Sequence, residues 1–254
     1  MIEDLKGKVV LITGSSTGIG AAAAVAFGAN GASVAVHYNK SKAEAEKVAA
    51  DVQKAGGKAI LVQGDVTSSA VCKAIVDKTA QSLGRIDVLI TNAGGLVQRA
   101  PVEQITDELF DQVLHLNARS ALMCIAAAVP HMRKQGGGAI INLTSVAARH
   151  GGGPGASVYA GAKAFVSSIT RGLAKELVKD NIRVNAVAPG VIYTPFHERY
   201  STPQMLESFK ATIPMNRIGT ADECTGAFLY LASNQLSGYV TGQILEVNGG
   251  QYMP

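Results

Sequence analysis

The sequence of 254 residues contains no tryptophan, and aromatic residues make up only 5% of it. A surface that stacks nucleic-acid bases on aromatic side chains is therefore not expected. Lys and Arg are scattered, and the chain has no block of like charges of the kind that marks a polybasic patch. We therefore expect neither nucleic acid nor a membrane as partner. The formal net charge of +4 still favours an anionic small molecule.

Cysteine is also scarce, since only Cys72, Cys124 and Cys224 occur and no C-x-x-C is present. An odd number of distant cysteines argues against a disulfide framework and a zinc site, and it predicts reduced thiols in a cytoplasmic protein. The histidines have no metal-ligand spacing, so no metal site is expected. The longest apolar stretch, Ala121 to Val129, ends at Pro130, well short of the ~20 residues that a membrane-spanning helix needs.

What the chain does have is a regular alternation of apolar β-type runs and longer helical segments. The pattern predicts strands at residues 8–13, 33–38, 58–63, 87–91, 139–144, 182–186 and 243–247. It predicts helices at residues 18–30, 42–55, 68–83, 106–134, 158–179 and 221–232. Nearly all-apolar strands that alternate with helices indicate an α/β fold, with a parallel sheet of seven strands covered on both faces. No linker or composition break appears, so we expect one domain over residues 1–254.

One segment, residues 191–219, is longer than an ordinary connecting loop. We interpret it as a lid over the substrate. The alternative is a helical excursion with an ordinary apolar face towards the core. The side chains that favour a binding surface are Phe196, His197, Tyr200, Met205 and Phe209.

A glycine-rich turn follows the first predicted strand, and a helix follows the turn. Glycine lets backbone N–H groups approach a phosphate, and a helix N-terminus adds a favourable dipole. The spacing G-x-x-x-G-x-G differs from both G-x-G-x-x-G and the P-loop. The alternative is a tight strand-to-helix connection. The candidate binding residues of this turn are Gly14, Ser16, Thr17, Gly18, Ile19 and Gly20.

The end of the second predicted strand bears on which dinucleotide binds. An acidic residue there would bind the ribose hydroxyls of NAD, but no acid occurs before Glu44. Lys40 and Lys42 suit the 2′-phosphate of NADP, so NADP(H) is favoured and NAD(H) remains possible. The alternative is a solvated basic turn. The candidate cofactor residues here are Tyr38, Asn39, Lys40 and Ser41.

Three side chains suggest acid–base chemistry. Tyr159 and Lys163 are four residues apart near the start of a predicted helix, so they share one face. An ammonium group beside a phenol favours the phenolate and lowers its pKa. Ser145 follows the fifth predicted strand, at the carboxyl edge where α/β proteins bind ligands. Its hydroxyl would polarise a carbonyl oxygen.

Taken together, these motifs resemble the short-chain dehydrogenases/reductases along essentially the whole chain. The match runs from the glycine turn through Asn92-Ala93-Gly94 to Ser145, Tyr159-x-x-x-Lys163 and Pro189-Gly190. The resemblance implies a single Rossmann-like, doubly wound domain that binds NAD(P)(H). It implies that Tyr159 is the general acid/base, and that Lys163 holds the nicotinamide ribose and lowers the Tyr159 pKa.

The resemblance also assigns roles to the remaining positions. Ser145 would polarise the substrate oxygen, and Asn117 would bend its helix and position a water that relays protons. The other cofactor contacts that it implies are Asp65, Val66, Asn92, Ala93, Gly94, Pro189, Gly190, Ile192 and Thr194. Leu96, Ala147, Arg149 and His150 follow the fourth and fifth strands and are candidates for the pocket wall.

The expected function is hydride transfer between a nicotinamide and a carbonyl or secondary alcohol. The branches that look most similar reduce 3-oxoacyl thioesters or act on polyols, sugars and ketones. Where the first branch has carrier-protein-docking arginines, this chain has Gly136 and Asp180, although Arg133, Lys134 and Lys179 lie close. A non-catalytic dinucleotide sensor is the remote alternative. Family members usually form homotetramers, so a homotetramer is expected.

Overall fold

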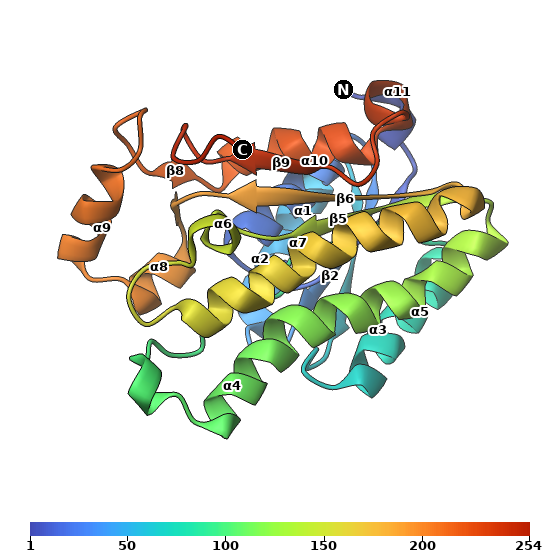
Figure 1. Cartoon of the computed structure of the whole chain (residues 1–254). Coiled ribbons are helices and arrows are strands. Elements are labelled where there is room, and N and C mark those ends of the chain that lie inside the picture. The colour runs from blue at the N-terminus through green and yellow to red at the C-terminus, as the bar shows by residue number, and fades with distance from the viewer.

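The computed structural model describes all 254 residues. Seven parallel strands form one sheet in the order β3-β2-β1-β4-β5-β6-β9. Figure 1 shows β5, β6 and β9 at one side of this sheet. These strands are β1 (Val9–Ile12), β2 (Ser33–Tyr38), β3 (Lys58–Gln63), β4 (Val88–Thr91), β5 (Gly138–Leu143), β6 (Ile182–Pro189) and β9 (Ile244–Val247). The predicted seven-stranded parallel sheet is confirmed. The sixth strand is longer than predicted and extends to Pro189, because β9 pairs with its second half.

Helices cover both faces of the sheet, so the doubly wound arrangement is also confirmed. One layer holds α1 (Gly18–Ala29), α2 (Lys42–Lys54) and α10 (Thr225–Ala232). The other holds α3 (Ser69–Leu83), α5 (Ser120–Lys134) and α7 (Ser157–Leu177). The short elements are α4 (Asp107–Leu114), α6 (Ala147–His150), α11 (Asn234–Ser237) and the 3₁₀ turns Glu3–Leu5, Val102–Gln104, Val178–Asp180 and Asp222–Cys224.

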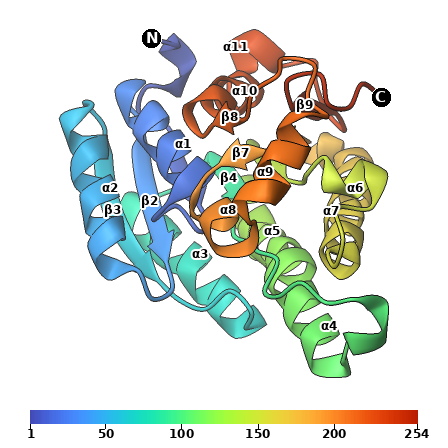
Figure 2. The same cartoon turned by 90° about the vertical axis from the view of Figure 1, so that its left-hand side faces the viewer.

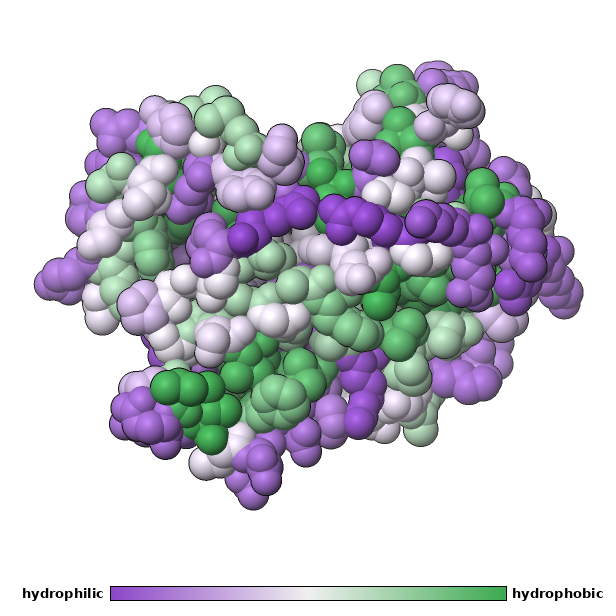
Figure 3. All heavy atoms as spheres, in the orientation of Figure 1, coloured by the Kyte–Doolittle hydropathy of each residue, from purple (hydrophilic) through white to green (hydrophobic).

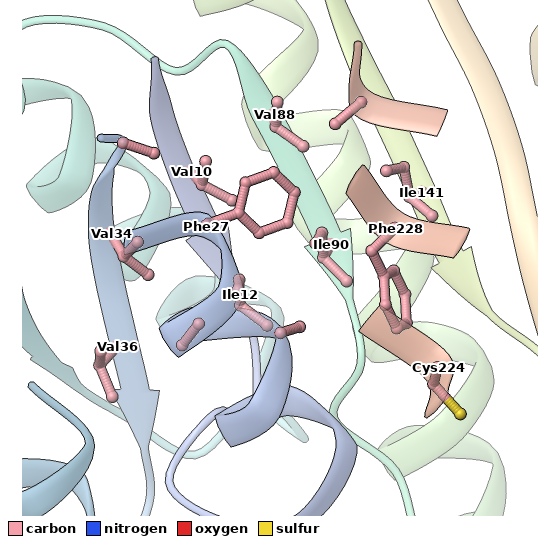
Figure 4. Close-up of a cluster of buried hydrophobic side chains, with 14 of the residues drawn as sticks. Val10, Ile12, Phe27, Val34, Val36, Val88, Ile90, Ile141, Cys224 and Phe228 are labelled. Atoms are coloured by element: carbon pink, nitrogen blue, oxygen red, sulfur yellow. The ribbon is translucent and has the colours of Figure 1, made fainter. Parts of the chain in front are cut away.

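Strand side chains alternate between two cores because successive residues point to opposite faces. Ile12 and Ile90 pack with Phe27 and Phe228 in the core on the α1 side, shown in Figure 4. Leu11 and the other alternate strand residues pack in the core on the α3 side. The chain reverses its direction of winding between β1 and β4, and α/β proteins bind ligands in the crevice at such a point.

The predicted helix over residues 106–134 is one continuous helix with a π-helical segment, His115–Arg119, between α4 and α5. Thr106 caps it by accepting a hydrogen bond from the Leu109 N–H at 3.2 Å. By length and composition alone, Asp107–Lys134 could cross a membrane, but half of its most apolar window is buried in this fold. Its α5 part packs against α3, which explains the apolar composition.

The segment over residues 191–219 folds into two short helices closed at the base by a two-stranded sheet. β7 (Ile192–Tyr193) pairs in parallel with β8 (Gly219–Thr220), and α8 (Pro195–Tyr200) and α9 (Pro203–Lys210) lie between them. Figure 2 looks onto the carboxyl edge of the sheet and shows α8 and α9 in front of it. The excursion is therefore helical, and it covers the edge where the predicted site residues gather.

Candidate active site

A cleft of about 940 Å³ opens at the carboxyl edge of the sheet, beneath α8 and α9. Every predicted cofactor residue except Gly20 lines it, and so do Ser145, Tyr159 and Lys163. The lining residues from the cofactor prediction are Gly14, Ser16, Thr17, Gly18, Ile19, Tyr38, Asn39, Lys40, Ser41, Asp65, Val66, Asn92, Ala93, Gly94, Pro189, Gly190, Ile192 and Thr194. The fold therefore brings segments from the ends of six strands to one site.

The glycine turn after β1 has the shape of a phosphate cradle. Gly14 has φ +65°, and a Cβ atom there would lie 2.9 Å from the Cα of Ala93. The first turn of α1 has no side-chain cap, so its N–H groups are available to an anion. Asn92 fixes the turn, because its Nδ2 donates to the carbonyl oxygens of Thr13 and Gly14, both at 2.9 Å. These features fit the diphosphate of a dinucleotide.

Gly20 has a different place from the one predicted. It lies outside the cleft, and a Cβ atom there would lie 2.5 Å from the Asn92 Nδ2. Its lack of a side chain makes room for the amide that fixes the turn. Gly20 therefore supports the phosphate cradle through Asn92 and does not line the cleft.

His37 holds the glycine turn from the side of β2, a role that the sequence did not reveal. Its Nδ1 accepts a hydrogen bond from the Gly14 N–H at 2.8 Å, and its Nε2 faces the Gly64 carbonyl oxygen at 3.0 Å. This pairing requires a neutral ring that carries its proton on Nε2. Burial lowers the pKa of His37 below its ordinary value, which keeps the ring neutral.

Acid should destabilise the protein through two buried imidazoles. Burial, together with the charge of Arg99, lowers the pKa of His197 to about 4, and burial also lowers the pKa of His37. The unfolded chain binds more protons below about pH 6.5, so stability present above that pH is lost as the pH falls towards 4. His197 alone accounts for about 3 kcal/mol at most. Urea unfolding at several pH values should show this loss.

A matched variant isolates the contribution of His197. His197→Leu should reduce the loss of stability between pH 6.5 and 4 and leave the share of His37 in place. An unchanged pH dependence in this variant would contradict the assignment.

The end of β2 presents one free cation to the cleft. Lys40 lines the cleft and forms no ion pair, whereas Lys42 lies outside it and pairs with Glu46 at 3.6 Å. The hydroxyls of Ser16 and Ser41 are hydrogen-bonded at 2.8 Å, which ties the glycine turn to this corner. Glu44, the first acidic residue after β2, also lines the cleft.

Asp65 closes the same corner from the end of β3. Its Oδ1 accepts hydrogen bonds from the N–H and the hydroxyl of Thr67 at 3.0 and 2.8 Å. These hydrogen bonds lower the pKa of Asp65, and Asn39 and Lys40 add to the effect. The carboxylate is therefore charged near neutral pH and oriented at the adenosine end of the predicted site.

The three predicted acid–base residues meet at the other end of the cleft. Ser145 follows β5, and its hydroxyl lies close enough to the phenol of Tyr159 to lower the pKa of that phenol. The Nζ of Lys163 lies 5.8 Å from the centroid of the Tyr159 ring and donates to the Leu143 carbonyl oxygen at 2.8 Å. The Thr144 hydroxyl faces the Lys163 carbonyl oxygen at 2.9 Å and holds this turn of α7 against the end of β5.

The pKa of the phenol differs from the expectation. Burial raises the pKa of Tyr159 to about 12, against the weaker effect of the Ser145 hydrogen bond. Burial lowers the pKa of Lys163 to about 8, since no carboxylate compensates its charge. In the chain alone, Tyr159 is therefore protonated at neutral pH, in the form that donates a proton.

Asn117 lies in the π-helical segment and is only 1% exposed. It does not line the cleft. Its Oδ1 accepts a hydrogen bond from the Gly95 N–H at 3.0 Å, and its Nδ2 donates to the Gly95 carbonyl oxygen at 2.8 Å. The predicted bend of the helix is present as the π-helical segment. The side chain fixes the loop after β4 rather than facing the substrate space.

The remaining wall of the cleft comes from α8, α9 and two loops. Of the candidate residues, Leu96, Ala147, His150, Phe196, His197, Tyr200 and Phe209 line it, whereas Met205 and Arg149 do not. Arg149 instead pairs with Glu246 at 2.9 Å. The Phe196 ring lies 5.7 Å from that of Tyr159 and 5.1 Å from that of Tyr200, measured between centroids. Sequence reasoning missed Arg99 and Gln251, which also line the cleft.

Comparison with known proteins places the chain among oxidoreductases. A family model described as "Enoyl-(Acyl carrier protein) reductase" matches residues 14–251. General stress protein 39 of Bacillus subtilis is 38% identical over 251 residues, which cover 99% of this chain and 86% of that protein. A 3-oxoacyl-[acyl-carrier-protein] reductase of Synechocystis is 38% identical, and the match covers 98% of both.

A solved structure agrees over the whole fold. The NADH-dependent reductase A1-R', described as responsible for alginate metabolism, is 42% identical with a TM-score of 0.91, covering 99% of this chain and 100% of that one. A second structure of the same reductase is a complex with NAD, at a TM-score of 0.89.

Proposed function

The chain belongs to the short-chain dehydrogenase/reductase family, and on that basis we propose that it reduces a small carbonyl compound, or oxidises the matching secondary alcohol, with NADP(H). The observation that carries this proposal is the meeting of Ser145, Tyr159 and Lys163 at one end of a cleft whose other end is the glycine cradle. A protein that only binds dinucleotides would need the glycine cradle but not these three side chains.

Each residue has a task that its position supports. The Ser145 hydroxyl polarises the carbonyl oxygen, and the Tyr159 phenol donates a proton to that oxygen as charge develops on it. Lys163 holds the nicotinamide ribose and keeps a positive charge beside the phenol. The bound nicotinamide supplies the hydride. Asn117 holds Gly95, and through it the loop that would border the nicotinamide.

A panel of ketones, sugars and acyl thioesters, assayed for oxidation of NADPH and NADH, tests the proposal. The corresponding alcohols are assayed in the reverse direction. Turnover of at least one carbonyl class is expected. A protein that binds the dinucleotide and turns over none of them would favour the sensor alternative.

Among substrate classes, we favour small ketones, sugars and polyols over carrier-bound acyl thioesters. The two positions expected to dock a carrier protein are Gly136 and Asp180. Asp180 pairs with the Nε of Arg133 at 2.8 Å, so the one nearby arginine is already neutralised. Lys134 and Lys179 are exposed and are the cations that remain there.

The choice of cofactor rests on Lys40, which should make NADPH bind more tightly than NADH. Lys40→Glu should weaken NADPH binding by about tenfold, because a charged hydrogen bond of about 1.5 kcal/mol or more is lost. Fluorescence titration of both cofactors measures the change. Lys42→Glu is the matched control, since Lys42 lies outside the cleft, and it should have little effect. Tighter NADH binding in the unchanged protein would contradict the preference.

Assembly and organisation follow the family. We propose a homotetramer built through the faces of α4, α5 and α7, and one domain with α8 and α9 as the lid. Figure 3 shows apolar atoms gathered over α4 and α7. Phe110 and Phe165 are 45% and 40% exposed there. Sedimentation should give a mass about four times that of the chain. The family and the three free cysteines also support a cytoplasmic location.

A further inference from the structure

We propose that the natural substrate carries a carboxylate several bonds from its reacting carbonyl, and that Arg99 binds it. This inference rests on the proposed function and specifies its substrate class. Arg99 lines the cleft from the loop after β4. It was not among the residues that the sequence singled out.

The first observation is the distribution of charge along the cleft. The only acidic residues that line it are Glu44 and Asp65, which lie after β2 and at the end of β3, at the adenosine end. The cationic side chains towards the lid are Arg99 and Arg199, with no acidic residue among their neighbours on the wall. A site of this kind attracts a negatively charged ligand.

The second observation is that the guanidinium of Arg99 is uncompensated. No carboxylate of the chain lies within 4.0 Å of it, since it forms none of the ion pairs in the structure. Burial lowers the pKa of Arg99. A half-buried cation without a counter-ion is costly unless a ligand supplies the charge.

The third observation is that the guanidinium is held in place. Its Nε donates to the Tyr200 carbonyl oxygen at 2.8 Å, and its Nη1 donates to the Pro154 carbonyl oxygen at 2.8 Å. Its Nη2 makes no hydrogen bond, so both of its N–H donors are free. The group is thus held in place before any ligand arrives, and a planar guanidinium matches a carboxylate in geometry.

The backbone two residues before Arg99 is strained. Val97 has φ +65°, and the Gln98 N–H donates to the Leu96 carbonyl oxygen at 2.8 Å, which is a strained γ-turn. A β-branched residue at positive φ persists only where its surroundings enforce it, and such strain concentrates at ligand sites.

The position of Arg99 sets the distance between the two substrate groups. Arg99 holds the carbonyl of Tyr200, whose ring packs on Phe196, and Phe196 packs on the catalytic Tyr159. Arg99 and the proton donor are therefore connected through two residues of α8 that also line the cleft. With Arg99 reached through this series of contacts rather than beside the phenol, we place several carbons between the ketone and the carboxylate of the oxo acid.

A simpler role for Arg99 would be a strap between α8 and the glycine-rich loop before α7. The two roles differ in what they do to charged and uncharged substrates. A strap acts on both alike, whereas an anion site acts only on the acid. Matched acids and esters therefore separate the two.

The test uses 2-oxobutanoate, 4-oxopentanoate, 5-oxohexanoate and 6-oxoheptanoate, each beside its methyl ester, with NADPH and with NADH. We expect kcat/KM for at least one acid to exceed that of its ester by about tenfold or more. Arg99→Gln should lower the kcat/KM of that acid by about 10- to 100-fold, mainly through KM, and that of the ester by less than about threefold. The kcat/KM of Arg99→Lys for the acid should lie between that of the unchanged protein and that of Arg99→Gln. Arg133→Gln, at the opposite edge of the sheet, is the control for loss of one arginine charge.

Two further measurements do not depend on turnover of the variants. The KM of the unchanged protein for the acid should rise with salt while that for the ester stays constant. The acid should also raise the melting temperature in the presence of NADP⁺ or NAD⁺, and this increase should vanish in Arg99→Gln. These results stand even where a variant folds poorly.

The outcomes separate the two proposals. Equal kcat/KM for acids and esters would overturn the carboxylate site and leave the oxidoreductase function intact. An equal fall of both values in Arg99→Gln would do the same. An Arg99-dependent increase in melting temperature without any turnover would support the anion site and overturn the function. Neither turnover nor an effect of the acids on melting would overturn both.

Discussion

Tyr159→Phe is expected to lower kcat/KM for carbonyl reduction by about 10³-fold while the dinucleotide still binds. Removing a general acid typically costs 10²- to 10⁴-fold. The phenol hydroxyl is the only group removed, and Ser145 is the side chain that acts on its pKa. The ring would keep its contact with Phe196, so the cleft should keep its shape. Initial rates and a fluorescence titration with NADPH measure the two effects.

The control for this variant is Tyr193→Phe. Tyr193 is 55% exposed on β7 and does not line the cleft, so the same chemical change there should leave the rate within about twofold. Ketone reduction by Tyr159→Phe at the unchanged rate would contradict the assignment of the proton donor. Loss of NADPH binding would show instead that the phenol is needed to form the cleft.

Much of the site could be predicted because it lies at strand ends. In a parallel sheet, the residues that follow each strand meet at one edge, so the order of apolar runs already gathers the glycine turn, Asn92, Ser145 and Pro189. The i, i+4 spacing likewise places Tyr159 and Lys163 on one face of α7. These arguments need only periodicity and connectivity.

The segment over residues 191–219 carries a local sequence signal for helices. Both of its helices begin with a Thr-Pro pair, at Thr194 and at Thr202. Proline suits the first position of a helix, and threonine is a common N-cap. Thr202 does accept a hydrogen bond from the Met205 N–H at 3.2 Å. The two helices were therefore predictable, but their position over the cleft was not.

Other features depend on contacts between distant segments. The partners of Arg99 are carbonyl groups 55 and 101 residues away, and no spacing rule reveals them. The two hydrogen bonds of Asn117 to Gly95 are set by the packing of the π-helical segment. The pKa of Tyr159 is raised by burial, which depends on packing against distant side chains such as Phe196 and not on the spacing to Lys163.

Lys163→Met is expected to abolish turnover and yet to leave the protein as stable as before, or more so. The ammonium is 2% exposed and has a single carbonyl partner, and burial lowers its pKa to about 8 from 10.5. Removing that buried charge gains up to about 3 kcal/mol, and the unpaired Leu143 carbonyl costs about 1–3 kcal/mol. Activity should fall at least about 10²-fold, as for other residues that assist proton transfer. Urea unfolding and initial rates at pH 7 measure the two quantities.

The pH dependence of stability gives this prediction its sharpest form. Because the unfolded chain keeps the Lys163 proton up to about pH 10.5 while the folded chain releases it near 8, the stability of the unchanged protein should rise from pH 8 to about 10. Above about 10, the raised pKa of Tyr159 acts in the opposite direction, because the unfolded phenol then ionises first. Lys163→Met should lack the rise between pH 8 and 10. A variant that loses more than about 1 kcal/mol at pH 7 would show that Lys163 stabilises the fold. A variant that keeps the rise would show that Lys163 does not cause it.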